Sequence, residues 1–353
     1  MNLARISLLC LVAAALLLFF GVQRTVAATS AEYLECGDRA EMGTPFKMCV
    51  VIQREQQEKA RADIATALGE ARRINNWMSE WMPETELSKV NQAAGLKPVE
   101  VSRELFRILR DALVVAKESN GAFDPTFNAF WGLYSFKKGQ EREPTEKEIK
   151  ERLPLVNWRA VVLDEGKSTV FLKEKGMKLG LGAVGKGYAA DIAAEKLKAL
   201  GYKGGYADGS GDTVFWGKKP GGAEWTTGVR DPYDNEKAIL RIYGTDFSIT
   251  TSGDDEKYFF KDGRRVHHIL DTKTGRSASR SRQATIIAKK GVDADTWSTT
   301  AFVLGPEAAM PLIEKHGFRA VLIGADGKVH ISKGLEKRST PWGDGYVVVG
   351  ELR

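Results

Sequence analysis

Apolar residues recur at helical spacing in four stretches of the chain. These stretches are 55–78, 102–119, 188–200 and 294–304. In the first of them the apolar residues stand three and four positions apart, as on the buried face of an amphipathic α-helix. That stripe consists of Ala60, Ile64, Ala67, Leu68, Ala71 and Ile74. The pattern predicts four helices, and a shorter helix is expected in the charged segment 137–154.

Elsewhere apolar and polar residues alternate, which is typical of strands. One such stretch, 168–173, directly precedes a glycine-rich segment. Asp262-Gly263 and Asp326-Gly327 each stand between two strand-like stretches, and they predict hairpins because Asp-Gly suits the tight turns that join paired strands. Further strands are expected at 41–54, 205–216, 226–230, 238–243, 247–251 and 283–289. No internal repeat or low-complexity linker appears, so residues 29–353 are expected to form a single domain.

Two of the expected loops are rich in aromatic residues. The loop 77–91 combines tryptophans and methionines, and the loop 121–136 contains phenylalanines, a tryptophan and a tyrosine. Apolar surface of this kind either folds onto the core or receives a planar ligand. Trp81 is the candidate for contact with such a ligand. Met42 stands beside a Gly-Thr turn, where its side chain either plugs the core or lies flat against a ring.

The N-terminus resembles an export signal. An apolar run from Ile6 to Val22 follows Arg5 and precedes Arg24 and several small residues, a pattern that predicts a signal peptide over residues 1–28. The protein is therefore expected to be periplasmic or otherwise exported. The alternative is an uncleaved segment that holds it at the inner membrane, although the run is shorter than the roughly 20 residues that a spanning helix needs.

Composition adds few constraints. The chain has 353 residues, of which 43% are hydrophobic and 28% charged, as in ordinary globular proteins. Loss of Arg5 and Arg24 would take the formal net charge from +6 to +4, which is too small to indicate nucleic-acid binding and is compatible with a small anionic ligand. Cys36 and Cys49 could form a disulfide if they lie on paired strands, or remain as two buried thiols.

The segment Leu179–Asp191, LGLGAVGKGYAAD, stands between a predicted strand and a predicted helix. A glycine-rich turn between a strand and a helix lets backbone N–H groups and the helix N-terminus approach an anion such as phosphate. Lys186 would add a full positive charge there. Gly180 to Lys186 fits the P-loop spacing G-x-x-x-x-G-K, but Gly187 stands where that motif needs Ser or Thr. A different phosphate-containing ligand is expected, and a purely structural glycine turn is the alternative.

Other candidate chemistry depends on spacing. Asp295 and Thr299 stand four residues apart at the start of a predicted helix, so their oxygens share one face and could hold Mg²⁺. The alternative is that Asp293 or Asp295 caps the helix and that Thr299 packs in the core. His267 and His268 are adjacent in a predicted strand, so only one of them can face a given pocket.

Six segments together resemble the ApbE family, the periplasmic FAD:protein FMN transferases. In chain order they are MGT at 42–44, MSEWMPETELSKVN, GAFDPTFNAFWGLYSF, LGLGAVGKGYAAD, SGDDEKYFFKDGRRVHHILDTKTG and DADTWSTTAFVLG. Their order and spacing match the family over nearly all of the expected mature chain. The resemblance implies an α+β fold of antiparallel sheets with packed helices, similar to duplicated tunnelling-fold units.

The resemblance also implies roles for particular residues. FAD would be surrounded by Met42, Trp81, Ala122, Phe123, Asp124, Lys186 and Ile269. A magnesium ion would be held by the carbonyl oxygen of Ala183 and by Asp295 and Thr299. His268 would transfer a proton or position the acceptor.

The implied reaction moves FMN from FAD to a Ser or Thr hydroxyl of a partner protein and releases AMP. The acceptor would carry the pattern D-x-x-[ST]-G-A-[ST], as in membrane redox subunits of the RNF and sodium-pumping NADH:quinone reductase type. Two other functions remain open: a metal-dependent FAD pyrophosphatase that gives FMN and AMP, and a flavin carrier without catalysis. Asp295 and Thr299 argue against a carrier, which needs no cation on the pyrophosphate.

The chain departs from the family pattern at two places. Gly180 replaces a frequent Asp, which puts one ligand contact in doubt. The segment Asp271–Gly275 lacks the family's proline and resembles the acceptor pattern itself, with Arg276 in place of Ala. Flavin attachment at Thr274 is therefore conceivable, although the family's own motif explains these residues.

Overall fold

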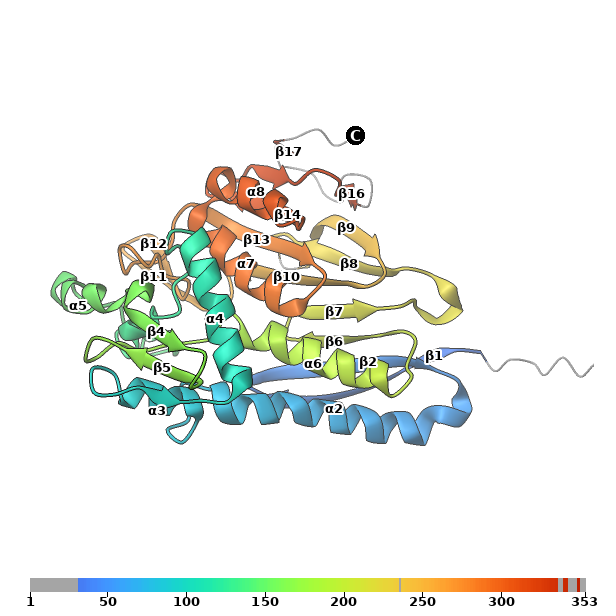
Figure 1. Ribbon diagram of the computed structural model, residues 1–353. Coiled ribbons are helices and arrows are strands. Elements are labelled where there is room, and N and C mark those ends of the chain that lie inside the picture. Colours follow the sequence, from blue (N-terminus) through green and yellow to red (C-terminus); the bar gives the residue numbers. More distant parts are fainter. Residues whose placement is uncertain (1–30, 235, 336–338, 342–347, 350–353) are drawn as a thin grey trace, which may run out of the picture.

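The computed structural model describes residues 31–234, 236–335, 339–341 and 348–349 (Figure 1). The expected signal peptide, residues 1–28, lies outside the described residues. Within those ranges, no helix combines the length and the apolar character that crossing a bilayer requires.

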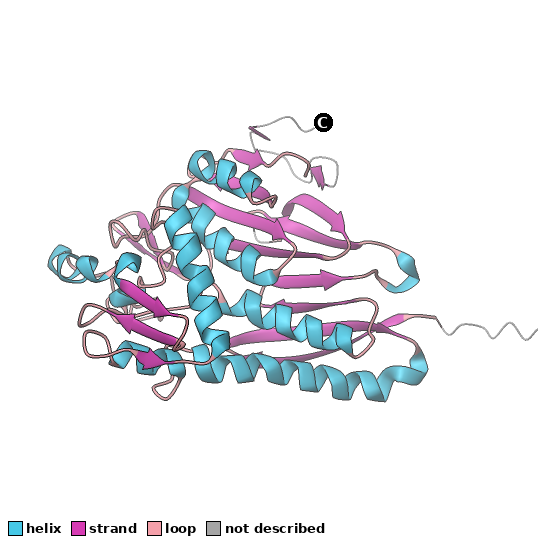
Figure 2. Ribbon diagram, viewed as in Figure 1, coloured by secondary structure: helices cyan, strands magenta, loops and turns pink. Residues whose placement is uncertain are grey.

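A nine-stranded sheet forms the centre of the molecule (Figure 2). Its strands, in spatial order, are β1 (Tyr33–Glu41), β2 (Thr44–Ile52), β6 (Gly205–Gly209), β7 (Thr213–Trp216), β10 (Phe247–Gly253), β13 (Ser281–Ala288), β14 (Arg319–Gly324), β15 (Val329–Ile331) and β17 (Val348–Val349). Every neighbouring pair is antiparallel except β15 and β17. Together with the helices this confirms the α+β fold. The likeness to duplicated tunnelling-fold units remains a prediction.

Helices cover one face of this sheet (Figure 1). They are α2 (Gln57–Met78), α4 (Arg103–Glu118), α6 (Gly185–Ala199), α7 (Gly291–Leu304) and α8 (Pro306–Lys315). All six residues of the predicted apolar stripe on α2 are buried, as expected for an amphipathic helix packed on a sheet. The four predicted long helices are confirmed. The helix α8 was not predicted.

Three smaller sheets surround this core. The first consists of β16 (Ser339–Pro341), β9 (Ala238–Gly244) and β8 (Trp225–Arg230). The second consists of β3 (Val99–Glu100), β5 (Thr169–Leu172) and β4 (Val161–Asp164). The third is the hairpin of β11 (Tyr258–Lys261) and β12 (Arg264–His267). Side chains of β8 and β9 share an apolar cluster with β7, β10, β13 and β14. The sheet is therefore buried on both faces over these strands.

The structure corrects two local predictions. The expected loop 77–91 contains a helix, α3 (Glu86–Gln92), whose first turn is capped by the Thr85 hydroxyl accepting from the Ser88 N–H at 3.0 Å. A helix this short spans less than two turns of apolar periodicity, so the pattern did not reveal it. The expected single strand 205–216 is the pair β6 and β7, joined by a turn.

Cys36 and Cys49 form a disulfide. The two residues are direct partners in the register of β1 and β2, which was the condition for pairing. Of the two alternatives left open by the sequence, the disulfide is therefore confirmed.

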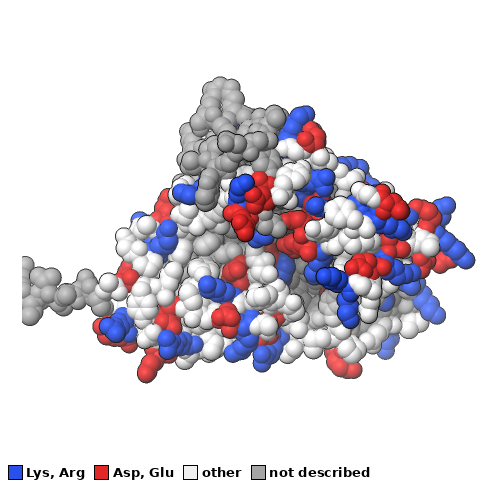
Figure 3. All heavy atoms as spheres, turned by 180° about the vertical axis from the view of Figure 1, so that it is seen from behind, with Lys and Arg blue, Asp and Glu red and all other residues white. Residues whose placement is uncertain are grey.

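The face opposite to the view of Figure 1 carries both signs of charge. Figure 3 shows acidic and basic side chains interspersed on it, with apolar and neutral side chains between them. A wide single-sign patch is the usual footprint of a nucleic-acid-binding surface. This face has no such patch among the described residues.

Candidate active site

The glycine-rich segment forms a tight turn that leads into α6. The N–H groups of Val184 and Gly185 donate to the Leu181 carbonyl at 3.0 and 2.9 Å, and α6 begins at Gly185. The Asn91 side chain accepts from the Leu179 N–H (2.7 Å) and donates to the Leu179 carbonyl (2.9 Å). The turn thus presents the N-terminus of α6, with its partial positive charge, in a fixed position.

The helices α6 and α7 approach each other closely at two glycines. A Cβ at Gly187 would lie 2.2 Å from the Gly291 carbonyl oxygen, and a Cβ at Gly291 would lie 2.6 Å from the Gly187 carbonyl oxygen. The Gly187 N–H donates to Asp295 Oδ2 at 3.0 Å. Position 187, where a P-loop has Ser or Thr, is glycine in this chain because no side chain fits at the contact with α7. The antiparallel sheet is likewise unlike the parallel sheet of a P-loop protein.

Lys186, in the first turn of α6, lies between two buried carboxylates. Its Nζ forms an ion pair with Asp212 and lies 3.8 Å from Asp295 Oδ1, and both Asp side chains are only 3% exposed. Burial raises the pKa of both carboxyl groups. Burial lowers the pKa of Lys186, but the charges of Asp295 and Asp212 outweigh this effect and raise it overall. With two buried carboxylates for one lysine, the cluster favours a further cation.

The sequence analysis missed Asp212. This residue follows the turn between β6 and β7, where Ser210 and Gly211 have φ values of 59° and 97°. The signal was the string DGSGD, in which glycines bring acidic side chains to the end of a strand pair. No spacing rule connects that string to Lys186, because β6 and α6 meet only through the tertiary fold.

The three expected metal ligands come from α7 and from the turn before α6, and α6 is joined to α7 by the hydrogen bond from Gly187 to Asp295. Asp295 and Thr299 lie on α7, and Ala183 lies in the turn directly before α6. The Thr299 hydroxyl lies 3.2 Å from Ser252 Oγ, a residue of β10. A carboxylate, a hydroxyl and a backbone carbonyl are the hard oxygen donors that Mg²⁺ prefers, so these residues fit the ion chemically. The described residues contain no cluster of three or more His, Cys, Asp or Glu side chains that could hold a metal ion, and the expected set has only one such side chain.

Met42 packs against the start of α6, and Trp81 pairs with a second tryptophan at the surface. Met42 has a φ of 52° in the turn between β1 and β2, and its Cε would lie 3.1 Å from a Cβ placed on Gly185. Trp81 is 72% exposed, and its ring centroid lies 3.5 Å from that of Trp131. Exposed aromatic rings and a thioether are suited to contact with a planar ring. Trp131 was within a predicted aromatic loop but was not singled out.

The other expected FAD contacts lie in two neighbouring segments. Ala122 and Ile269 are buried in one apolar cluster, and Phe123 is buried in another. The carboxylate of Asp124 accepts from the Thr126 N–H at 2.8 Å and from the Trp158 N–H at 3.0 Å. The Asp124 side chain therefore stabilises its own loop by accepting hydrogen bonds from backbone N–H groups.

The two adjacent histidines have different surroundings, but they do not share a strand: β12 ends at His267, and His268 lies in the bend that follows. His267 is 3% exposed, and its Nε2 lies 2.9 Å from the Ala278 carbonyl oxygen. His268 is partly buried, with its ring 6.5 Å from that of Phe136. Burial lowers the pKa of His268 to about 4, and the charges of Lys257, His267 and Lys186 act in the same direction. Its Nδ1 is buried and has no hydrogen-bond partner among the described residues, and the lowered pKa keeps the imidazole neutral.

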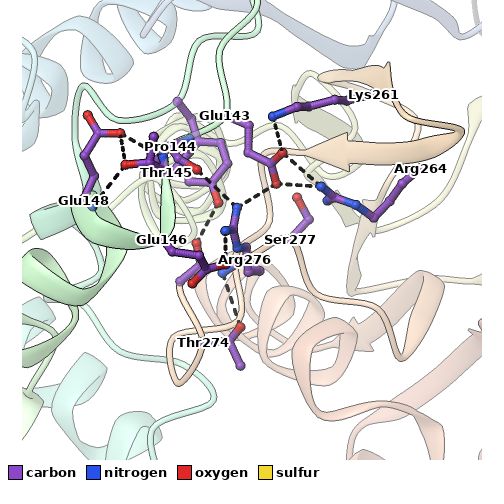
Figure 4. A network of polar contacts seen from close by, with 12 residues as sticks. Glu143, Pro144, Thr145, Glu146, Glu148, Lys261, Arg264, Thr274, Arg276 and Ser277 are labelled. Atoms are coloured by element: carbon purple, nitrogen blue, oxygen red, sulfur yellow. Dashed lines mark hydrogen bonds and ion pairs between the residues drawn. The ribbon is translucent and has the colours of Figure 1, made fainter.

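An ionic network fixes the hairpin that leads to His268 (Figure 4). The Glu143 side chain, only 2% exposed, pairs with Lys261 at 3.3 Å and Arg264 at 2.9 Å from the hairpin, and with Arg276 at 3.0 Å from the loop beyond it. A buried carboxylate with three cationic partners is fully compensated. The network therefore holds the hairpin and the following loop against the segment 134–143.

Gly180 has no space for a side chain in this structure. A Cβ there would lie 2.9 Å from the Asn128 Cβ and 3.2 Å from the Phe127 ring. The Asn128 amide instead donates to the Leu179 carbonyl at 3.0 Å. The chain thus accommodates the departure at Gly180 by packing Asn128 against the turn.

The structure therefore assembles a lysine, buried carboxylates, a helix N-terminus and a neutral histidine. Such groups can bind a pyrophosphate and accept a proton from a hydroxyl. The family model that matches the sequence, over residues 42–322, is that of the ApbE family.

Two curated relatives show the extent of the similarity. A protein of Treponema pallidum (strain Nichols), named FAD:protein FMN transferase, is 32% identical over 328 residues, which cover 86% of this chain and 91% of that protein. A protein of Klebsiella pneumoniae (strain 342) with the same name is 31% identical over 271 residues and covers 75% of this chain and 83% of its own.

Solved structures share the fold. The crystal structure of an ApbE protein from Thermotoga maritima superposes with a TM-score of 0.80 at 29% identity and covers 86% of this chain and 99% of its own. The apo flavinyl transferase ApbE of Pseudomonas stutzeri has a TM-score of 0.75 at 23% identity, covering 87% and 97%. At the latter identity the likeness concerns the fold alone.

Proposed function

The chain belongs to the ApbE family, and on that basis we propose that it is an FAD:protein FMN transferase. The observation that carries the proposal is the cluster at the N-terminus of α6, where Lys186 lies between Asp212 and Asp295. A site for a pyrophosphate needs this combination of a helix N-terminus, a cation and metal-ligating oxygens.

The reaction joins the hydroxyl oxygen of an acceptor Ser or Thr to the phosphorus of the FMN half of FAD. The bond between that phosphorus and the bridging oxygen breaks, the bridging oxygen leaves with AMP, and the hydroxyl proton goes to a base. Phosphoryl transfer of this kind depends mainly on position and on neutralised charge. Magnesium, when bound by Ala183, Asp295 and Thr299, would neutralise charge on the phosphate oxygens.

The protein's own groups account for the remaining tasks. The charge of Lys186 and the N–H groups at the start of α6 bind the pyrophosphate. Neutral His268, with an unpartnered Nδ1, accepts the proton of the acceptor hydroxyl. Met42 and Trp81 contact the flavin ring.

The acceptor and the location belong to the same proposal. The acceptor is a protein with the pattern D-x-x-[ST]-G-A-[ST], in the first instance a membrane redox-complex subunit. The enzyme acts in the periplasm, as residues 1–28 suggest. Residues 29–353 act as a single domain.

The test is to incubate the purified protein with FAD, Mg²⁺ and an acceptor domain that carries this pattern. FMN attached to the acceptor Ser or Thr, detected by mass spectrometry together with one equivalent of AMP, is the expected result. Free FMN and AMP with no labelled acceptor would instead establish a pyrophosphatase. FAD that binds and stays intact with every divalent cation tried would leave only a carrier.

A further inference from the structure

Each of the helices α6 and α7 provides a carboxylate that accepts hydrogen bonds from N–H groups at the N-terminus of the other helix. Asp191 of α6 accepts from the Gly291 N–H at 2.7 Å and from the Val292 N–H at 2.9 Å, at the start of α7. Asp295 of α7 accepts from the Gly187 N–H at 3.0 Å, at the start of α6. Each helix thus satisfies N–H groups that the other leaves without an intrahelical partner.

These reciprocal hydrogen bonds, together with the glycine contact, fix the position of one helix relative to the other. The glycine contact between Gly187 and Gly291 leaves no room for a side chain on either helix, so the backbones touch directly. Both carboxylate oxygens of Asp191 accept hydrogen bonds from the first turn of α7. Thr299 lies two turns further along α7, and a rotation of α7 about its axis would move Asp295 and Thr299 together.

Asp191 is not neutralised by a nearby cation. Burial raises its pKa to about 6 in spite of the two N–H donors, and the charges of Asp293 and Glu195 act in the same direction as burial. Among the described residues, no Lys, Arg or His forms an ion pair with it. A carboxylate kept in such surroundings is a candidate for a functional role, since a neutral capping side chain would avoid the cost of burying a charge.

We propose that Asp191 is a positioning residue for the metal site: it fixes the first turn of α7 so that Asp295 and Thr299 are held at the N-terminus of α6. Asp191 itself touches neither metal nor FAD. The inference rests on the proposed function, because it assumes that these two residues bind the cation.

The test uses the variant Asp191→Asn, which keeps the shape but leaves one oxygen to accept two N–H groups. Glu195→Gln is the matched control, since it removes the same charge one turn along α6 at an exposed position. Mn²⁺ binding is measured by electron paramagnetic resonance, FAD binding by flavin fluorescence in EDTA, and FMN transfer as a function of Mg²⁺ concentration.

In Asp191→Asn we expect Mn²⁺ affinity to fall roughly tenfold, as for the loss of one hydrogen bond to a charged group. FAD affinity in EDTA should change less than twofold, and excess Mg²⁺ should restore most of the transfer rate. The control should match the wild-type protein in all three measurements. A merely structural role would lower the melting temperature without a selective loss of metal affinity.

Unchanged Mn²⁺ affinity in Asp191→Asn, or a transfer rate that excess Mg²⁺ does not restore, would overturn the inference. If the variant does not fold, Asp191→Glu replaces it, because a longer carboxylate displaces α7 while keeping the charge, and the same tenfold loss is expected. Absence of FMN transfer by the wild-type protein would contradict the proposed function instead, and the Mn²⁺ titration would still test the position of α7.

Discussion

His268 occupies surroundings that keep its ring neutral and leave one buried ring nitrogen without a partner. Its pKa is lowered to about 4, chiefly by burial, and its Nδ1 lacks a partner among the described residues. A neutral ring can accept a proton at pH 7, and its low pKa makes it a weaker base than an ordinary histidine. These properties also make the residue's role measurable.

Replacement of His268 by Gln should lower the rate of FMN transfer by about 10²–10⁴-fold, the usual contribution of a general base. FAD affinity should stay within about twofold, because the pyrophosphate contacts lie at Lys186 and α6. Steady-state transfer and flavin fluorescence would measure the two effects. His330→Gln serves as the control, and a loss of FAD affinity in parallel with rate would argue that His268 binds FAD.

The protonation of His268 should show no step near pH 6.5. Its pKa is about 4 in the folded protein, so the ring should stay neutral from pH 8 down to about pH 5. Because unfolded histidine titrates near 6.5, the unfolded chain binds more protons between these two values, and the His268 contribution to stability falls as the pH drops through that window. An NMR titration of labelled histidines checks this, and a His268 midpoint above pH 6 would contradict it.

At the scale of elements, the contact between α6 and α7 depends on glycine at two positions, Gly187 and Gly291. Gly187→Ala would place a methyl group 2.2 Å from a backbone oxygen of α7. We expect a loss of about 3 kcal/mol or more in the free energy of unfolding, because backbone cannot move aside as a side chain can. Denaturant unfolding is the measurement.

Gly182→Ala, in the glycine-rich turn directly before α6, is the matched control. A Cβ there would lie 3.8 Å from Glu80 Oε1, which is an ordinary contact, so stability should change by less than about 0.5 kcal/mol. Equal losses in the two variants would show that the turn, and not the helix contact, requires glycine.

The elements show which parts of the structure sequence patterns could predict. The long helices and the Asp-Gly hairpins were predicted because their signals are local: an apolar stripe on α2, a turn at Asp262-Gly263. Helix α3 was missed since seven residues carry too little periodicity. The glycine-rich turn was found because its chemistry is continuous in sequence, whereas Asp212 and Asp191 were not assigned roles because their partners lie on other elements.

For the whole molecule, the disulfide should matter because it secures an edge of the sheet. Among the residues that the structure describes, β1 is the terminal strand of the large sheet and pairs only with β2. Cys36→Ala with Cys49→Ala should lower the free energy of unfolding by about 3 kcal/mol, the size expected for a closed loop of this length.

Thermal unfolding of this double variant and of the wild-type protein, each with and without a reducing agent, measures the effect. The reducing agent should lower the melting temperature of the wild-type protein and leave that of the variant unchanged. A wild-type melting temperature that does not respond, although free thiols are detected, would contradict the expected role of the disulfide.

The same strand pair bears on the order in which the chain folds. β1 and β2 are complete once the chain reaches Ile52, whereas the other neighbour of β2 is β6, which begins at Gly205. A local hairpin forms within roughly 1–10 μs, but the pairing of β2 with β6 must first close a loop of more than one hundred residues. In the finished protein Cys36 is exposed but Cys49 is 0% exposed, so an oxidant can attack Cys49 directly only while the nascent hairpin still lacks its neighbours, and later oxidation must begin at Cys36.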